Sequence, residues 1–553
     1  MSTFFTRSLV IILSIFILTA CAAPAATPEA AQVISENARA LPAQRGDHFA
    51  TAGTCTACHT SLKDAAGNDL SYDTLWRSSM MANALRDPYY RATVRQEIEA
   101  KPEHRAVIEE KCAVCHVPMS FTTQTFAGET VTLLDDGAAN PDHPLHTLAD
   151  DGISCTVCHQ IQAENFGLPE SFTGGYLIDS ETPTGERMVY GPYPTADTTI
   201  NLMKAATGFV PQQSDHLASS DTCAVCHVLY TPIIDAEGNF SDQMFPEQMP
   251  YMEWRHSGFA ETRSCQDCHM PEVDGTVMIA TTGGEARTGV NRHTFAGGNA
   301  YMVDLLRTFG NDLAVHAKEE HFQQTIDLTH KLLQESTATL EIDTAREGET
   351  LAVTVTVNNL AGHKLPSAFP SRRAWLHVLV QDAAGVTAFE SGGWAPESGA
   401  IFGNDHDVEE ALYEPHYETI TDDEQVQIYE AIMGDLNGAV TTTLLDAAAY
   451  VKDNRLLPLG FDKATAETDI AVVGAALDDA NFGSGGDTVR YEIATSAEGA
   501  LTVTVELLYQ SIGFQWGEKF AGQETAEAMA FNGYRAELPS APVILYQDTV
   551  TLE

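Results

Sequence analysis

The sequence is poor in basic residues, in cysteine and in long apolar segments. Its 553 residues include 30 Lys and Arg against 77 Asp and Glu, a formal net charge of -47. Such a field repels nucleic-acid phosphates, which argues against a nucleic-acid-binding role. We expect a solvated acidic surface; cationic partners or a high-salt habitat are the alternatives. After residue 21 no apolar run is long enough to predict a transmembrane helix.

Only 11 cysteines occur, and ten of them fall into five C-x-x-C-H units, at residues 55–59, 112–116, 155–159, 223–227 and 265–269. Two thiols three residues apart can each form a thioether with one vinyl group of a heme, and the adjacent His then reaches the iron. Disulfides or zinc sites would not require a His after every second Cys. The sequence therefore predicts five covalently bound hemes c.

The predicted heme-attachment residues are Cys55, Cys58, Cys112, Cys115, Cys155, Cys158, Cys223, Cys226, Cys265 and Cys268. The predicted proximal iron ligands are His59, His116, His159, His227 and His269.

Residues 1–21 have the features of an export signal. Arg7 precedes an apolar run from Leu9 to Leu18, which is short for a bilayer span. The run continues into Thr-Ala-Cys21, which resembles a bacterial lipobox and predicts lipidation of Cys21; an uncleaved anchor is the alternative. Both place the chain outside the cytosol, facing the periplasm or the cell exterior. Residues 22–47, rich in Ala, Pro and Gln, are predicted to be a flexible tether.

The chain divides near residue 337. The five motifs leave about 43 residues per heme, too few for a conventional core, so the porphyrins are expected to form much of the core of a helical and irregular pentaheme module over 48–300. Apolar spacing predicts a helix from Asp87-Pro88 to Lys111 that leads directly to Cys112. A bridging helix is predicted over 301–336.

After residue 337 the apolar period changes from 3.6 to 2 residues. Segments 351–357, 375–380, 501–507 and 543–552 predict strands of an antiparallel β-sandwich-like domain over 337–553. Residues 391–485 are expected to form a loop-rich, partly helical insertion. No nucleophile elbow, phosphate loop or dinucleotide motif occurs there, so we expect a structural or partner-binding domain. The predicted class of the whole chain is α+β.

The motifs and their surroundings resemble the family of bacterial multiheme cytochromes related to cytochrome c-554. The resemblance extends over most of the mature chain and rests on Trp76-Arg-Ser-Ser-Met-Met81, Gly152-Ile-Ser-Cys155, Tyr251-Met-Glu-Trp254, Cys268-His-Met-Pro271, His293-Thr-Phe-Ala-Gly-Gly-Asn299 and Gly362-His-Lys-Leu-Pro366. It implies covalent hemes and redox chemistry. The family includes electron carriers and relatives of nitrogen and sulfur oxyanion enzymes, so the reaction stays open.

An iron that only carries electrons needs a sixth ligand, whereas an iron that binds substrate needs an open position. The resemblance implies distal histidines just before a motif, in a His-x-Phe-x-Gly stretch, or in a Gly-His-x-x-Pro loop. Where relatives have Trp-x-x-Ser-x-His, this chain has Met81, with Met80 as a rival. The ranked distal candidates are His293, His146, His216, His363, Met81 and His256.

Each distal candidate could instead be a surface, turn or core side chain. If His363 binds iron, the C-terminal domain is fixed to the heme module.

Two functions of different classes follow from these patterns. In the first, all five irons are six-coordinate and pass electrons between respiratory donors and acceptors on the outer side of the cell membrane, with redox proteins as partners. The alternative is an oxidoreductase of nitrogen or sulfur compounds with one open heme. Every motif ends in His, with no Lys variant to mark a catalytic heme. We therefore expect an electron carrier without catalytic residues; a subunit of a respiratory complex or of a heme filament is a third possibility.

Overall fold

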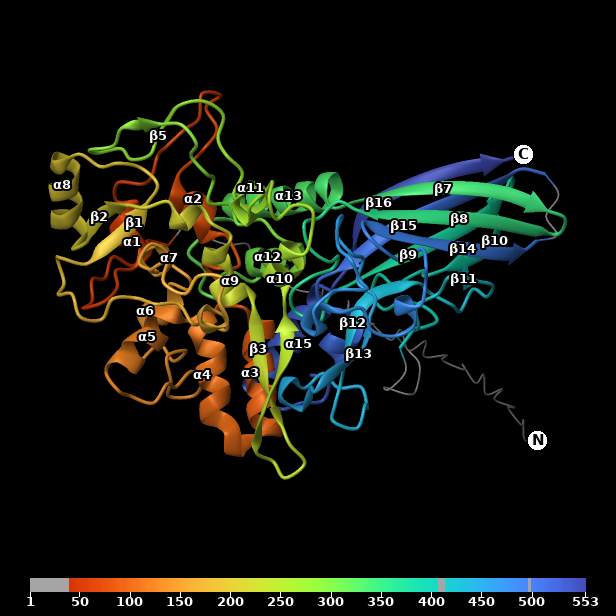
Figure 1. Ribbon diagram of the computed structural model, residues 1–553, viewed down its shortest axis with the longest axis horizontal. Coiled ribbons are helices and arrows are strands. Elements are labelled where there is room, and N and C mark those ends of the chain that lie inside the picture. Colours follow the sequence, from red (N-terminus) through yellow and green to blue (C-terminus); the bar gives the residue numbers. More distant parts are fainter. Residues whose placement is uncertain (1–38, 406–412, 496–498) are drawn as a thin grey trace, which may run out of the picture.

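The computed structural model describes residues 39–405, 413–495 and 499–553. The predicted leader, Cys21 and the tether up to residue 38 lie outside these ranges. The helices that carry the five motifs gather at one end of the molecule, and the long strands lie at the other (Figure 1). This mixture of helices and sheets agrees with the predicted α+β class. Within the described ranges, no helix is both long and apolar enough to cross a membrane.

Residues 39–47, predicted to belong to the tether, pack against the first motif. Leu41 lies in an apolar cluster with Trp76. The carbonyl of Pro42 accepts hydrogen bonds from the backbone N–H of Gly53 at 2.9 Å and from the Thr51 hydroxyl at 2.6 Å. A side chain at Gly53 would place its Cβ 2.5 Å from the Leu41 carbonyl, so only glycine allows this approach. The folded body therefore includes residues before 48.

The N-terminal part is built from short helices joined by loops. Its helices are α1 (Ala52–Thr56), α2 (Tyr72–Arg77), α3 (Pro88–Ala100), α4 (Arg105–His116), α5 (Pro118–Phe126), α6 (His146–Asp150), α7 (Cys155–Cys158), α8 (Asp197–Thr207), α9 (Asp221–His227), α10 (Pro250–Arg255) and α11 (Cys265–His269). Its two-stranded pairs are β1 (Met188–Gly191) with β2 (Val210–Gln213), β3 (Leu229–Ile234) with β4 (Phe240–Gln248), and β5 (Val277–Met278) with β6 (Ala286–Arg287).

The single helix predicted from residue 88 to residue 111 is two helices, α3 and α4. Asp87 caps α3, because its carboxylate accepts from the backbone N–H groups of Tyr89 and Tyr90 at 2.8 and 3.1 Å. The helix ends at Lys101, since Pro102 lacks an N–H and disfavours the helical conformation of the residue before it. The second helix, α4, contains the second motif, as predicted.

The predicted bridge over 301–336 is likewise divided, into α12 (Ala300–Thr308) and α13 (Glu319–Ser336). Gly310, Asn311 and Asp312 follow the end of α12 and are all poor helix formers.

The C-terminal part holds two sheets. The six-stranded sheet has the order β13 (Ala449–Asp453), β12 (Ile428–Gly434), β9 (Arg373–Asp382), β15 (Leu501–Gln510) and β16 (Val543–Leu552), with β10 (Thr387–Ser391) also paired to β9. The four-stranded sheet has the order β11 (Thr419–Ile420), β14 (Gly486–Ala494), β8 (Thr350–Asn359) and β7 (Ala338–Glu347). All these pairs are antiparallel except β11 with β14. Side chains from both sheets, including Val355, Val378 and Val503, form one buried cluster.

The segment 391–485, expected to be a loop-rich and partly helical insertion, contributes strands to the sheets. It supplies β12 and β13 to the edge of the six-stranded sheet and β11 to the other. Its helical turns, in the part that the structure describes, are the short 3-10 helices η4 (Leu444–Asp446), η5 (Thr468–Ile470) and η6 (Ala475–Leu477).

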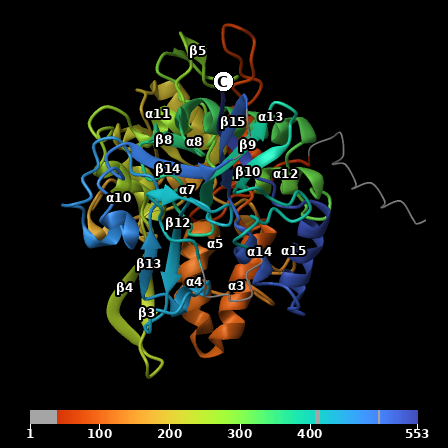
Figure 2. The ribbon, with the colours of Figure 1, turned by 90° about the vertical axis from the view of Figure 1, so that its right-hand side faces the viewer.

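Two helices between β15 and β16, α14 (Phe514–Glu518) and α15 (Ala526–Glu537), join the two parts. Figure 2 shows α15 beside α3 of the N-terminal part. Arg95 of α3 donates to Glu527 of α15 at 3.0 Å, and Tyr89 packs edge-to-face against Phe531, with ring centres 5.3 Å apart. Through α15, the C-terminal part thus packs against α3 of the N-terminal part.

Candidate heme-binding sites

Each of the five motifs lies on a short helix or begins in one. The second to fifth are carried by α4, α7, α9 and α11, and the first begins in α1. The fifth has a capping box, in which Ser264 and Asp267 satisfy each other's backbone N–H groups. One helical turn places the two cysteines of a motif on the same side of the helix. All ten motif cysteines are free thiols, as attachment to heme requires.

Three proximal histidines are held in the same way. Their Nδ1 atoms donate to a backbone carbonyl at 2.6 Å in the pairs His59 with Ile279, His159 with Tyr190, and His269 with Ala296. The Nε2 lone pair is then free, which is the usual arrangement of a metal-bound histidine. Burial lowers the pKa of each of these rings, so they are neutral at pH 7, the form that binds metal.

His293 lies opposite His159 of the third motif. Their ring planes are 6° apart and their ring centres 6.5 Å apart, too far for direct stacking. Two imidazoles bound on opposite sides of one metal ion, each with its nitrogen about 2.0 Å from the metal, have ring centres roughly 6.3 Å apart. Nδ1 of His293 donates to the carbonyl of Asn291 at 3.2 Å, which again leaves Nε2 free. The two residues fit opposite ligands of one iron.

The fifth motif has a similar partner from the C-terminal part. His363 lies on the loop after β8, and its ring is 7° from parallel to that of His269, with ring centres 6.3 Å apart. Nδ1 of His363 donates to the carbonyl of Lys364 at 2.8 Å. The spacing and the free Nε2 atoms fit a second pair of opposite ligands.

The second and first motifs have tyrosines near the proximal ring. Tyr90 is stacked on His116, with ring centres 3.8 Å apart, and Tyr72 lies edge-on to His59 at 5.6 Å. The hydroxyl of Tyr90 is buried and has no hydrogen-bond partner among the described residues. Burial lowers the pKa of His116, and that of His227 in the fourth motif, to about 4. Tyr90 was not among the predicted site residues, since nothing in the sequence distinguishes it from other aromatic residues.

The remaining histidine candidates have other surroundings. His146 begins α6 and donates from Nδ1 to the carbonyl of Ala138 at 3.0 Å. Both nitrogens of His216 are engaged, one with the Ser214 hydroxyl at 2.6 Å and the other with the Ile161 carbonyl at 2.8 Å. To bind iron, His216 would have to give up one of these hydrogen bonds.

His256 and Met81, the last two distal candidates, lie near the C-terminal part and near the third motif. Nδ1 of His256 donates to the carbonyl of Met252 at 2.8 Å, and its Nε2 is 3.5 Å from Glu467 of the C-terminal part. Met81 is half-buried, and its carbonyl accepts from the backbone N–H of Ile153, just before the third motif. Met81 therefore fixes the loop that enters that motif through its backbone.

Thiols from different motifs lie side by side. In three pairs from different motifs, one thiol is near enough to shift the pKa of the other: Cys55 with Cys155, Cys115 with Cys226, and Cys223 with Cys265. Cys158 of the third motif is close enough to both thiols of the fourth to interact with them electrostatically. These neighbours connect all five motifs, and the fourth motif adjoins three others.

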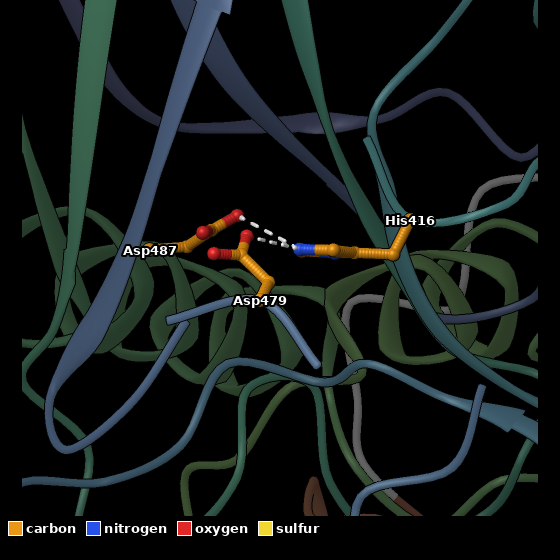
Figure 3. A group of neighbouring side chains, drawn as sticks. All are labelled: His416, Asp479 and Asp487. Carbon is orange, nitrogen blue, oxygen red and sulfur yellow. Dashed lines mark hydrogen bonds and ion pairs between the residues drawn. The ribbon is translucent and has the colours of Figure 1, made fainter. Parts of the chain in front are cut away.

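A buried polar cluster lies outside the motifs, in the C-terminal part. Figure 3 shows His416, Asp479 and Asp487 facing one another. Nε2 of His416 is 3.0 Å from a carboxylate oxygen of Asp479 and 4.0 Å from one of Asp487. Burial raises the pKa of Asp487. A histidine and two carboxylates could hold a divalent cation, so the hydrogen bonds around them decide between a metal site and a structural cluster.

The hydrogen bonds favour the structural cluster. Nδ1 of His416 accepts from the side-chain amides of Gln427 at 2.9 Å and Asn454 at 3.2 Å. Neither amide can be reversed, because its oxygen accepts a backbone N–H, that of Tyr417 or of Glu430. Nε2 therefore carries the hydrogen and donates it to Asp479. A metal on Nε2 would require that hydrogen on Nδ1, where it would face two N–H groups.

No protein-family model matches the chain, and no curated protein matches it. Among solved structures, the chain is similar to a penta-heme cytochrome c552 from Thermochromatium tepidum, with a TM-score of 0.50 and 16% sequence identity. The match covers 91% of this chain and 98% of the cytochrome. The chain therefore shares the overall fold of that penta-heme cytochrome.

Proposed function

We propose that this chain is a pentaheme c-type cytochrome that carries electrons. The observation that carries the proposal is the opposed pairing of His159 with His293 and of His269 with His363, at the spacing of two ligands of one metal ion. Two of the histidines belong to C-x-x-C-H motifs, whose cysteines would attach the heme. Bound hemes would supply one-electron chemistry, and two histidine ligands leave an iron no position for substrate.

The arrangement of the thiols supports transfer between sites. Because each cysteine would be bonded to the edge of its heme, neighbouring thiols of different motifs would bring the attached groups close to one another. The fourth motif, with three neighbours, would be the junction. Cys268 of the fifth motif is exposed, whereas the other nine motif cysteines are partly buried. A redox partner would reach the fifth site most easily.

The N-terminal sequence supports a place for this activity. The export signal and Cys21 would anchor the chain by lipid on the outer side of a cell membrane, in the periplasm or at the cell exterior. Its partners would be the redox proteins that donate and accept the electrons. The net charge of -47 favours partners with a basic docking surface.

Low-temperature electron paramagnetic resonance of the oxidised holoprotein tests the proposal, because it counts low-spin and high-spin irons. We expect five low-spin irons per chain, with potentials in the low range typical of two histidine ligands. One high-spin iron per chain would overturn the pure carrier and support a catalytic heme.

A second candidate, an oxidoreductase of nitrogen or sulfur compounds, is favoured by one observation. Among the described residues, the ring of His116 contacts that of Tyr90, and no second histidine ring stands opposite it, so the iron of the second motif would keep a position open for a substrate. The same spectrum distinguishes the candidates, because a catalytic iron at the second motif would be high-spin and would change its signal when nitrite or hydroxylamine is added.

A further inference from the structure

Two short stretches that are far apart in the sequence meet beside the fifth motif. Glu253 of α10 is fully buried, and one of its carboxylate oxygens accepts from the backbone N–H of Lys364 at 3.2 Å and from the hydroxyl of Ser367 at 2.5 Å. Next to it, Trp254 lies against Gly362, where an added Cβ would be 3.4 Å from the indole. Two residues of the heme module, Glu253 and Trp254, therefore contact the loop on the two sides of His363.

The second carboxylate oxygen of Glu253 enters a buried ionic network. It is 2.9 Å from the guanidinium of Arg455, which also contacts Asp453 at 2.7 Å. The ammonium of Lys364 lies 2.7 Å from the same Asp453, and Lys364 is fully buried. Two cations and two carboxylates balance one another in a buried site. Loss of one member would leave a buried charge unpaired.

The sheets hold the other side of the same loop. Asn359, at the end of β8, donates from its side-chain amide to the carbonyls of His363 and Leu456, both at 3.0 Å. Leu365 and Leu456 exchange two backbone hydrogen bonds at 2.9 Å. These contacts fix the loop relative to the sheets but not relative to the fifth motif. The hydrogen bonds from this loop to the heme module go to Glu253.

We propose that Glu253 is a positioning residue for the sixth ligand of the fifth iron. Its carboxylate holds residues 364–367 against α10, so that the His363 ring stands opposite His269. The inference rests on the proposed function, since it needs an iron between the two rings. It assigns a role to the Tyr251-Met-Glu-Trp254 stretch, which contains no iron ligand of its own.

The test uses full-length holoprotein with Glu253→Gln, which keeps the size and one acceptor but removes the charge that holds Arg455, and with Ser367→Ala. We expect one of the five hemes to become partly high-spin in Glu253→Gln, with binding of the sixth ligand weakened by about 10–100-fold, the usual effect of losing a residue that supports a metal ligand. Added imidazole should restore the low-spin signal of that heme. Ser367→Ala should give the same change to a smaller extent.

Asp405→Asn is the matched control. Asp405 pairs with Arg373 at 2.6 Å, and both are buried. Its carboxylate also accepts from Ile401 and Asn404, and in the described ranges it has no hydrogen bond to residues 362–367. Its loss should lower the melting temperature and leave five low-spin hemes. If folded Glu253→Gln keeps the wild-type spin states and potentials while His363→Ala has one high-spin heme, the positioning role of Glu253 is wrong and the ligand assignment stands. Five low-spin hemes in His363→Ala would instead overturn the ligand assignment on which it rests.

Discussion

The ring of His363, on the loop after β8, lies nearly parallel to the ring of His269 at the end of α11, with centres 6.3 Å apart. Replacing His363 with Ala should therefore open one iron of five without disturbing a thioether. We expect one high-spin heme by electron paramagnetic resonance and visible spectroscopy, and its return to low spin with imidazole. Five low-spin hemes in the folded variant would mean that the C-terminal part contributes no ligand.

His293→Ala should open a different iron, that of the third motif, because the ring of His293 stands opposite His159. The double variant with His363→Ala should then show two high-spin hemes rather than one. His216→Ala is the control: both nitrogens of His216 are already hydrogen-bonded, so we expect five low-spin hemes. A high-spin heme in the control variant would restore His216 as a ligand.

The intact mass of the mature protein should equal the chain from Cys21 onward, with five hemes, no disulfide and a lipid on Cys21. Cys268→Ala should impair attachment of the fifth heme and give little stable protein, since a missing porphyrin leaves a large void. A mass short by one heme in the wild type would show that one motif is not used.

The buried carboxyl of Asp87 should make the stability of the protein depend on pH. Burial raises the pKa of its carboxyl from the ordinary 3.8 to about 6. The folded state therefore holds a proton that the unfolded state has lost, and stability falls as the pH rises from about 4 to about 6. Asp87→Asn keeps an acceptor for the N–H groups of Tyr89 and Tyr90 but carries no charge.

The Asn variant and the wild type should be about equally stable below pH 4, and above pH 6 the variant should be more stable by up to about 3 kcal/mol. Urea unfolding at several pH values measures the difference, in which the effect of the other acidic groups cancels. Asp87→Ala should be about 1 kcal/mol less stable than Asp87→Asn at every pH, because neither carries a charge and only Ala loses the helix cap. If the difference in the free energy of unfolding between Asp87→Asn and the wild type is the same at every pH, the raised pKa of Asp87 is wrong.

Local patterns made much of this fold predictable. The strands β8, β9, β15 and β16 contain the segments 351–357, 375–380, 501–507 and 543–552, because alternation of apolar residues reports one buried face of a strand. The position of α4 also followed from helical spacing, since it leads into Cys112.

Features that depend on tertiary contact were not predictable. The break at Lys101 is readable from Pro102 in hindsight, but the apolar spacing continues across it. Strands β12 and β13 were missed because they gain their stability from the edge of β9, far away in the sequence. Glu253 lies in the Tyr251–Trp254 stretch on which the family resemblance partly rests. A single Glu before a tryptophan, however, does not indicate in the sequence that it will contact Lys364. The positions of the iron ligands depend on such long-range contacts.

The closeness of thiols from different motifs has a consequence for maturation. In a chain that folded before its hemes were attached, Cys55 and Cys155, or Cys223 and Cys265, would already be neighbours. Oxidising compartments outside the cytosol would join such neighbours as disulfides, which block the thiols. The hemes must therefore be attached before the chain folds. Protein exported from cells that cannot deliver heme should accumulate these disulfides. They would be visible as faster-migrating bands on non-reducing gels.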